Sequence, residues 1–304
     1  MKKLIVLFAV VVMASTALMS QVMVWKNGEI VGQYSVNDVD SITFRKAEAS
    51  ALAGALDGRF SISSNRQVCF SKGNLQYQSS TGTWRFAENQ YDMIGRENGN
   101  IGKPEYEGWI DLFSWGASGY EGIAPDSLAL FAYFEQLEDI TNTNYDWGRY
   151  CAISNGGNRA GLWRTLTRDE WDYIFVLRKN ADKLRARATV NGVAGYVILP
   201  DAFAERLEED GLINFVTKGE GYEINVYTAE EWAAFEADGA VFFPAAGCRN
   251  HEMVFNVGSF GYVWATNYNG EESAYCIFFS AYDAEVYYSV RENGLTVRLV
   301  RDFE

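Results

Sequence analysis

Two stretches of the chain have the apolar spacing of a helix and begin with the same capping pattern. In the first, Thr167 and Glu170 form an S/T-x-x-E capping box, in which each side chain accepts a hydrogen bond from the other residue's backbone N–H. Leu166 before the cap and Trp171 after it have the spacing of a hydrophobic staple. Apolar positions then recur at three- and four-residue steps and predict one mostly apolar inward face, formed by Trp171, Ile174, Phe175 and Arg178.

The second stretch, Tyr227–Ala237, repeats this pattern. Thr228 and Glu231 make its capping box, and Tyr227 and Trp232 make its staple. Two main helices are therefore expected in the chain.

The remaining pattern predicts short strands separated by long loops. Met23–Tyr34 alternates apolar residues around Asn27-Gly28, which is a strong hairpin signal, and Asp38–Phe44 adds a third short strand. Further strands are expected at Gly192–Pro200, Ala240–Pro244, Gly261–Thr266, Ala274–Ser280 and Thr296–Val300, with three β segments inside Phe60–Ala87. Short strands with two helices predict an α+β fold.

The first twenty residues have the features of a secretory signal. Lys2 and Lys3 precede an apolar run from Leu4 to Met19 that is short for a transmembrane helix, although a membrane anchor is the alternative. We expect a signal peptide at 1–20, a small β segment at 21–45, a linker at 46–57 and one domain at 58–304. The protein is then exported to the periplasm, the cell surface or the medium, with no membrane span after the signal is removed.

The net charge, the four cysteines and the single histidine limit the partners and the reactions that are plausible for this chain. The formal net charge of −14 argues against nucleic acid and anionic membranes as partners. The four cysteines allow up to two disulfides or stay free as small buried residues, and both options remain open for Cys69, Cys151, Cys248 and Cys276. The spacing of the cysteines matches no zinc-binding pattern, and no metal or cofactor is expected. His251 is the only histidine, and we expect it in an exposed turn beside Glu252.

Several motifs occur in the order found in one family. Trp163–Tyr173 (WRTLTRDEWDY) resembles the W-R-L-P-T-x-x-E-W-E-Y element of formylglycine-generating, sulfatase-modifying-factor-like domains and of the Fibrobacter succinogenes major paralogous domain. Segments similar to later motifs of that second group are Phe243–Arg249, Val257–Thr266, Ala274–Phe279 and Arg291–Val300. The resemblance implies a C-type-lectin-like fold of the sulfatase-modifying-factor type, with short twisted antiparallel sheets. DVDSITF at Asp38–Phe44 also resembles a segment of exported proteins of Bacteroidetes-type bacteria.

The chain lacks the motifs that carry catalysis and calcium binding in related proteins. The enzymes of the formylglycine group use a cysteine pair and an R-G-G-S-W segment, and this chain has Cys248 and Cys276 but no such segment. The sugar-coordinating triplets of calcium-dependent lectins are also missing. No catalytic residue and no calcium site are transferred to this chain.

The strip Trp264–Glu292 is rich in tyrosine, asparagine and acids. Such side chains make amphipathic, adaptable contacts, and aromatic faces stack on sugars or on partner side chains. The alternative is that they are ordinary strand aromatics with polar turns. The ligand-binding candidates are Trp264, Asn267, Tyr268, Tyr282, Asp283, Glu285, Tyr287 and Tyr288.

A second group lies in the Gly-rich loops. Exposed aromatic and acidic residues in loops often have functions. Trp115 and Trp147 are expected to fill the hydrophobic floor beneath these loops. Asp146 belongs to an Asp- and Asn-rich loop that is expected to be solvated rather than to bind calcium. The group consists of Asp111, Trp115, Tyr145, Asp146 and Trp147.

The resulting interpretation is an exported, non-enzymatic module that binds a glycan or a protein surface through its C-terminal strip. Three alternatives remain. In the first, the protein is a hypervariable binding protein, because the strip resembles the terminus of proteins diversified by retroelements on this fold. In the second, it is an enzyme of the formylglycine type that acts through a cysteine. In the third, it is a component of a surface assembly and docks through Trp25–Phe44.

Overall fold

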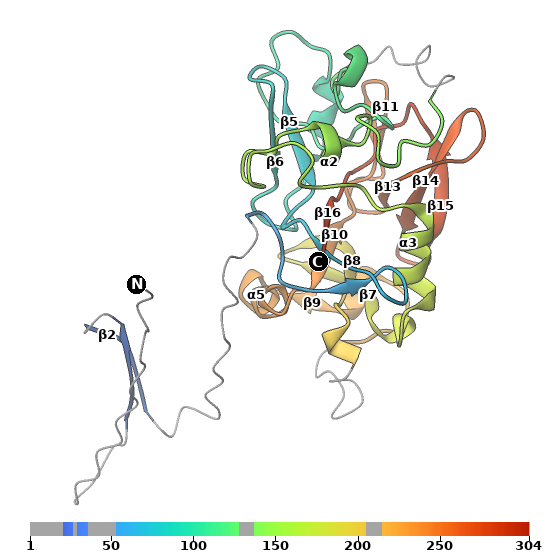
Figure 1. Cartoon of the computed structure of the whole chain (residues 1–304). Coiled ribbons are helices and arrows are strands. Elements are labelled where there is room, and N and C mark those ends of the chain that lie inside the picture. Colours follow the sequence, from blue (N-terminus) through green and yellow to red (C-terminus); the bar gives the residue numbers. More distant parts are fainter. Residues whose placement is uncertain (1–20, 27–28, 36–52, 128–136, 205–214, 304) are drawn as a thin grey trace, which may run out of the picture. The chain divides into compact units, whose positions relative to one another are not determined.

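The computed structural model describes residues 21–26, 29–35, 53–127, 137–204 and 215–303 (Figure 1). The chain divides into two compact units, residues 1–49 and residues 50–304. In the first unit, β1 (Gln21–Lys26) and β2 (Glu29–Ser35) pair antiparallel, with Lys26 opposite Glu29, so the expected hairpin is confirmed. The expected strand at Asp38–Phe44 and the signal segment lie outside the described residues.

The second unit is built from short, mostly antiparallel sheets and few helices, which is an α+β architecture. Three of its sheets pair β16 (Val300–Asp302), β4 (Gln67–Phe70) and β3 (Phe60–Ser61); β5 (Leu75–Gln78) and β6 (Thr83–Phe86); and β11 (Cys248–Asn250) and β12 (Met253–Phe255). A four-stranded sheet has the order β10 (Val241–Pro244), β8 (Val193–Ile198), β7 (Arg185–Val190) and β9 (Val226–Tyr227), and only its β7–β9 pair is parallel.

Both predicted helices are present with their capping boxes. α3 (Arg168–Asp172) begins at Thr167, whose Oγ1 accepts from the Glu170 N–H at 3.2 Å, while Glu170 Oε2 accepts from the Thr167 N–H at 3.0 Å. α3 continues into a π-helical turn, η4 (Tyr173–Leu177), and the predicted inward residues of this segment are all buried. The second helix, α5 (Ala229–Ala237), has the same cap at Thr228. The other helical segments are α2 (Trp147–Tyr150), η2 (Gly95–Asn100), η3 (Tyr120–Gly122), η5 (Ala181–Lys183) and η6 (Tyr222–Ile224).

The C-terminal sheet consists of β13 (Gly261–Tyr268), β14 (Ser273–Phe279) and β15 (Ala284–Val290), in that order, with β15 at its edge (Figure 1). Two expected strands correspond to β13 and β14. The expected strand at Thr296–Val300 is mostly irregular, because only Val300 lies in β16. Sequence patterning missed β15 as a strand, because its exposure pattern does not alternate regularly.

Two hydrophobic clusters cover the opposite faces of this sheet. We call them the tryptophan cluster, which contains Trp84, Trp115, Trp147, Trp163 and Trp264, and the phenylalanine cluster, which contains Phe60, Phe70, Phe175, Phe243 and Phe279. Trp264 and Cys276 pair across the strands within the first cluster, and Val263 and Ile277 pair within the second. Because successive strand residues point to opposite faces, β13 and β14 are buried on both sides.

The globular unit starts before the predicted boundary at residue 58. The Leu56 N–H donates to the Phe70 carbonyl at 2.8 Å, and the Lys72 N–H donates to the Gly54 carbonyl at 2.8 Å. Leu56 is also buried in the phenylalanine cluster. The end of the expected linker is therefore part of the domain. In the described part of the chain, no helix has both the length and the apolar character needed to cross a bilayer.

A partly buried ion-pair network joins the start of α3 to the C-terminal strand. Arg164 donates to both carboxylate oxygens of Glu170, at 2.7 and 3.0 Å, and to both oxygens of Asp302, at 2.9 and 2.8 Å. Arg164 and Glu170 are buried, whereas Asp302 is exposed. Exposed Arg66 approaches the same two acids, each at 3.2 Å.

We predict that Arg164→Ala lowers the free energy of unfolding by about 3–5 kcal/mol, because Glu170 then keeps a buried charge without its main partner. Arg66→Ala is the matched control, since it removes an exposed partner of the same acids and is expected to cost at most about 1 kcal/mol. Urea unfolding of both variants measures the difference, and equal losses would contradict this assignment.

Candidate functional site

The structure divides the predicted strip into buried and exposed residues. Trp264 is fully buried, and its Nε1–H donates to the Phe113 carbonyl at 2.7 Å. Asn267 is half-buried; its Oδ1 accepts from the Arg168 N–H at 2.7 Å, and its Nδ2 donates to Asp139. The prediction that Trp264 presents its ring to a ligand is therefore wrong, because the tryptophan cluster encloses it. Asn267 already uses its amide to join β13 to the start of α3.

The other six candidates are exposed. Their side chains belong to three places: the end of β13, the turn between β14 and β15, and β15 itself. Tyr282 is the most exposed of the four tyrosines, at 69%, and the others are 43–48% exposed. The exposed set is Tyr268, Tyr282, Asp283, Glu285, Tyr287 and Tyr288.

Strand register places these residues in cross-strand rows. Tyr287 lies opposite Cys276, which lies opposite Trp264, so one row runs from the core to the surface. The next row runs from Tyr262 through Phe278 to Glu285. The core therefore fixes the position of the β15 side chains.

Five rings form a continuous chain of contacts over this sheet, which we call the aromatic ribbon: Phe260, Tyr262, Phe278, Tyr287 and Tyr288. Phe278 is central, with ring centroids 5.6 Å from Phe260, 5.2 Å from Tyr262 and 5.9 Å from Tyr287. Tyr287 and Tyr288 stack at 4.9 Å with an interplanar angle of 13°. Neighbouring strand residues normally point to opposite faces, so this stacking requires at least one of the two rings to turn towards the other.

Sequence reasoning missed the inner half of the ribbon. Phe260, Tyr262 and Phe278 are half-buried and precede β15 in the chain. One face of the sheet carries alternate residues of each strand: Tyr262 and Trp264 on β13, and Cys276 and Phe278 on β14. This two-residue period could have shown that the four side chains share a face. It could not have shown which of them the core covers and which reach solvent.

Tyr268 is held over a buried cation. The Arg291 guanidinium carbon lies 5.7 Å from its ring centroid and 4.9 Å from that of Trp115. Arg291 is buried and donates to the carbonyls of Leu137 and Gly270, both at 2.6 Å. This exposed ring is therefore fixed by the packing beneath it.

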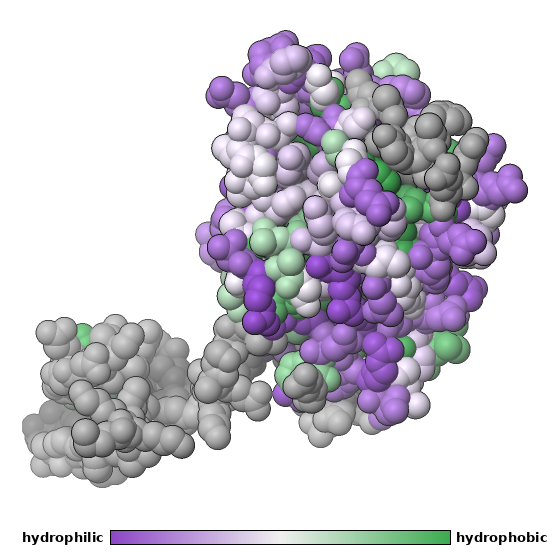
Figure 2. Space-filling view, turned by 45° about the horizontal axis from the view of Figure 1, so that its top comes forward, coloured by the Kyte–Doolittle hydropathy of each residue, from purple (hydrophilic) through white to green (hydrophobic). Residues whose placement is uncertain are grey.

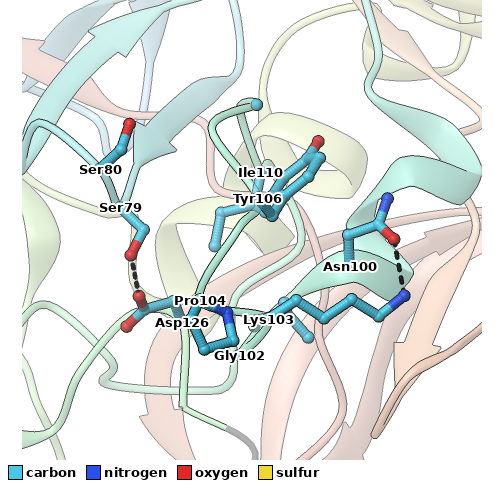
Figure 3. A pocket seen from close by; sticks show the side chains of 11 residues that line it. Ser79, Ser80, Asn100, Gly102, Lys103, Pro104, Tyr106, Ile110 and Asp126 are labelled. Carbon is cyan, nitrogen blue, oxygen red and sulfur yellow. Dashed lines mark hydrogen bonds between the residues drawn. The ribbon is translucent and has the colours of Figure 1, made fainter.

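In two small pockets of the structure, polar side chains already form hydrogen bonds with other side chains of the protein. The first pocket, of about 140 Å³, lies beside the β5–β6 turn; in it Ser79 donates to Asp126, and Lys103 Nζ donates to Asn100 Oδ1 at 2.9 Å (Figure 3). Small-molecule sites are typically about 300–1,000 Å³, so this one is small for a drug-sized ligand.

The second pocket, of about 330 Å³, lies between β3 and η4. Its acid, Asp201, accepts hydrogen bonds from Ser61 Oγ at 2.6 Å, Gln67 Nε2 at 3.0 Å and Arg178 Nη1 at 3.2 Å. These contacts connect β3, β4 and the end of η4, so the acid acts structurally.

The thiols are free and mostly buried. Cys69, Cys151 and Cys276 are buried and Cys248 is half-buried. Of the two options that the sequence leaves open, the structure therefore has free thiols. Burial raises the pKa of each thiol above its ordinary value. A nucleophilic cysteine needs the opposite shift, because the thiolate is the reactive form.

The loop candidates contribute to the core. Trp115 and Trp147 are fully buried, as expected, and donate to the carbonyls of Ala265 and Ala117. Asp111 and Asp146 are also buried, so the expectation that Asp146 is solvated is wrong. Asp146 accepts from the Thr165 Oγ1–H at 2.8 Å and caps α2.

Hydrophilic residues dominate the face shown in Figure 2, where hydrophobic residues form only small patches. His251 is exposed in the β11–β12 turn with a φ of 51°, as expected for a turn residue. Among the described residues, no group of three or more His, Cys, Asp or Glu side chains has the geometry to hold a metal ion.

Comparison of the chain with protein-family models, with curated proteins and with solved structures gave no match.

We predict that Cys248 reacts first when the native protein meets a disulfide-exchange reagent, because it is the only half-buried thiol among the four. Cys248→Ala removes the fast phase, and urea exposes the remaining thiols. A fast phase that survives this substitution would contradict the burial described here.

We predict a pH-dependent contribution from Asp111. Burial raises the pKa of its carboxyl from 3.8 to about 6, although hydrogen bonds from the Ile94 N–H and Asn98 oppose the shift. The folded state therefore takes up the proton first, and this group favours folding more as the pH falls from 7 towards 4. Relative to the non-titrating variant Asp111→Asn, the unfolding free energy of the wild type should rise by roughly 2–3 kcal/mol over that range. Urea unfolding at several pH values tests this, and a constant difference would contradict it.

Proposed function

We propose that this protein is an exported, non-enzymatic binding module whose ligand, a glycan or a protein surface, contacts the exposed end of the aromatic ribbon. Tyr268 and Tyr282 would extend this contact, and Asp283 and Glu285 would supply hydrogen-bond acceptors. The single observation that carries the proposal is the stack of Tyr287 on Tyr288, continued inward through Phe278.

Ring packing supports a binding role for this surface. Tyrosine supplies a large amphipathic contact area with few rotatable bonds, so little entropy is lost when a partner orders it. Here the rings already contact one another before a ligand arrives, which lowers that cost further.

We also propose the C-type-lectin-like fold for residues 50–304. Its support is the ordered set of motifs together with the α+β architecture. The most characteristic motif residues serve the core: Arg164 pairs with Glu170, and Trp171 and Arg298 are buried. Motif residues that stabilise a scaffold are expected when different members place different ligand-binding side chains on it.

The thiols favour binding over the formylglycine-type alternative. Cys276 is fully buried in the tryptophan cluster, and burial raises the pKa of both Cys248 and Cys276. Both shifts disfavour the thiolate, which is the nucleophilic form of a cysteine.

A diversified ligand-binding face is the second candidate function. The observation that favours it is the division of the strip into buried and exposed residues. Trp264 and Arg291 are buried in the fold, whereas four tyrosines of the strip are exposed. Such exposed positions tolerate variation. A neighbouring reverse transcriptase gene, with a near-copy of the last segment differing at adenines, would establish it.

We predict that Tyr287→Ala and Tyr288→Ala each weaken binding by about tenfold, since a ring contact contributes about 1–2 kcal/mol. Glycan and protein arrays would first identify a ligand, and biolayer interferometry would then compare the variants. Tyr150→Ala is the matched control, because Tyr150 is equally exposed, at 42%, but lies on α2. Equal affinity of all three variants would contradict the proposal.

A further inference from the structure

The free edge of β15 has a defined hydrogen-bonding pattern. The Ser280 N–H donates to the Asp283 carbonyl at 2.8 Å, and the Arg291 N–H donates to the Glu272 carbonyl at 3.0 Å. These bonds fix the hydrogen-bonded pairs at the two ends of the β14–β15 ladder. Bonded and non-bonded pairs alternate in an antiparallel ladder, so Glu285, Tyr287 and Ser289 bond inward to β14.

The intervening residues, Val286 and Tyr288, therefore direct their N–H and C=O groups away from the sheet. On either side of them, two carbonyls of the same edge already have partners. The Ala284 carbonyl accepts from Arg185 Nη1 at 3.2 Å, and the Val290 carbonyl accepts from the Asn293 N–H at 3.0 Å. No such bond to Val286 or Tyr288 is found within the described part of the chain.

This edge lacks most of the usual protection against pairing. Natural edge strands carry lysine, proline or a bulge that discourages a further strand. β15 has the sequence AEVYYSV and an unbroken register with β14, and Glu285 is its only charged residue. Such a segment offers a template for an added strand.

The surroundings of the edge are acidic. Glu271, Glu272, Asp283 and Glu285 are exposed, and the one basic residue between Trp264 and Glu292, Arg291, is buried. Three arginines of other elements contact the sheet or its β14–β15 turn. Arg185 donates to the Ala284 carbonyl, Arg187 Nε donates to the Ser280 carbonyl at 2.9 Å, and Arg168 pairs with Asp169 at 2.9 Å. Four exposed acids therefore lie near the edge with fewer unpaired cations. An incoming strand with lysine or arginine would complement these acids and place its cations near the Tyr287 and Tyr288 rings.

We propose that β15 binds an extended, basic peptide segment of a partner protein by β-strand addition, with Val286 and Tyr288 as the pairing residues. The added strand would exchange main-chain hydrogen bonds with these two residues, and the rings would contact its alternate side chains. The inference rests on the proposed binding function and chooses a protein partner over a glycan.

Val286→Pro is the test variant, and Val286→Ala is its matched control. Proline removes the outward N–H but no bond to β14, and edge strands tolerate proline at such positions. Alanine truncates the side chain and keeps the N–H. Both variants would be checked for native circular dichroism and thermal unfolding.

The probe is a random peptide library selected on the purified chain. We expect the enriched peptides to be basic and to alternate polar and apolar residues. Their affinity for the protein should fall about tenfold in the Val286→Pro variant and stay unchanged in the Val286→Ala variant. N-methylation of the best peptide, one residue at a time, should weaken binding at every second position, and this readout does not depend on how a variant folds.

Three outcomes would overturn the inference: no enriched peptide, equal binding to both Val286 variants, or an N-methylation profile without a two-residue period. If a glycan binds and its affinity falls in Tyr287→Ala but not in Val286→Pro, the strand-addition inference fails while the proposed binding function stands. If neither Tyr287→Ala nor Tyr288→Ala affects any ligand, the proposed function itself fails.

Discussion

The sheet β13–β15 is anchored because β13 and β14 are buried on both faces. Trp264 and Cys276 pack into the tryptophan cluster on one face, and Val263 and Ile277 pack into the phenylalanine cluster on the other. A strand held in this way has little freedom to shift its register, since a one-residue slip would move every side chain to the wrong face. The position of β15, and of each exposed ring on it, follows from this constraint.

The same constraint separates buried from exposed side chains within one short sequence. Trp264 and Arg291 are covered by the core, whereas Tyr287 and Tyr288 stand at the edge. Buried arginines such as Arg291 bond to carbonyl groups and hold loops against the sheet. The chain can therefore present an acidic and aromatic edge without a deep cavity, and a strand or a flat ligand surface suits such an edge better than a small molecule.

Local signals in the sequence predicted local structure well. The capping boxes at Thr167 and Thr228 and the pairing of β1 with β2 depend only on neighbouring residues, and all three were confirmed. The fate of each aromatic ring in the C-terminal strip was not predictable in this way. Trp264 and Tyr287 occupy one cross-strand row, and only the order of strands and the packing of distant loops decide which ring is covered. For the same reason Phe260, Tyr262 and Phe278 were missed.

Hydrogen–deuterium exchange of the free protein, resolved to single amides, tests the central claim most directly. If β15 is a firmly held edge strand with an open side, the amides of Glu285, Tyr287 and Ser289 exchange slowly and those of Val286 and Tyr288 exchange fast. Uniformly fast exchange along the strand would contradict its anchoring by the two clusters. Uniformly slow exchange would show that its outer side is already covered.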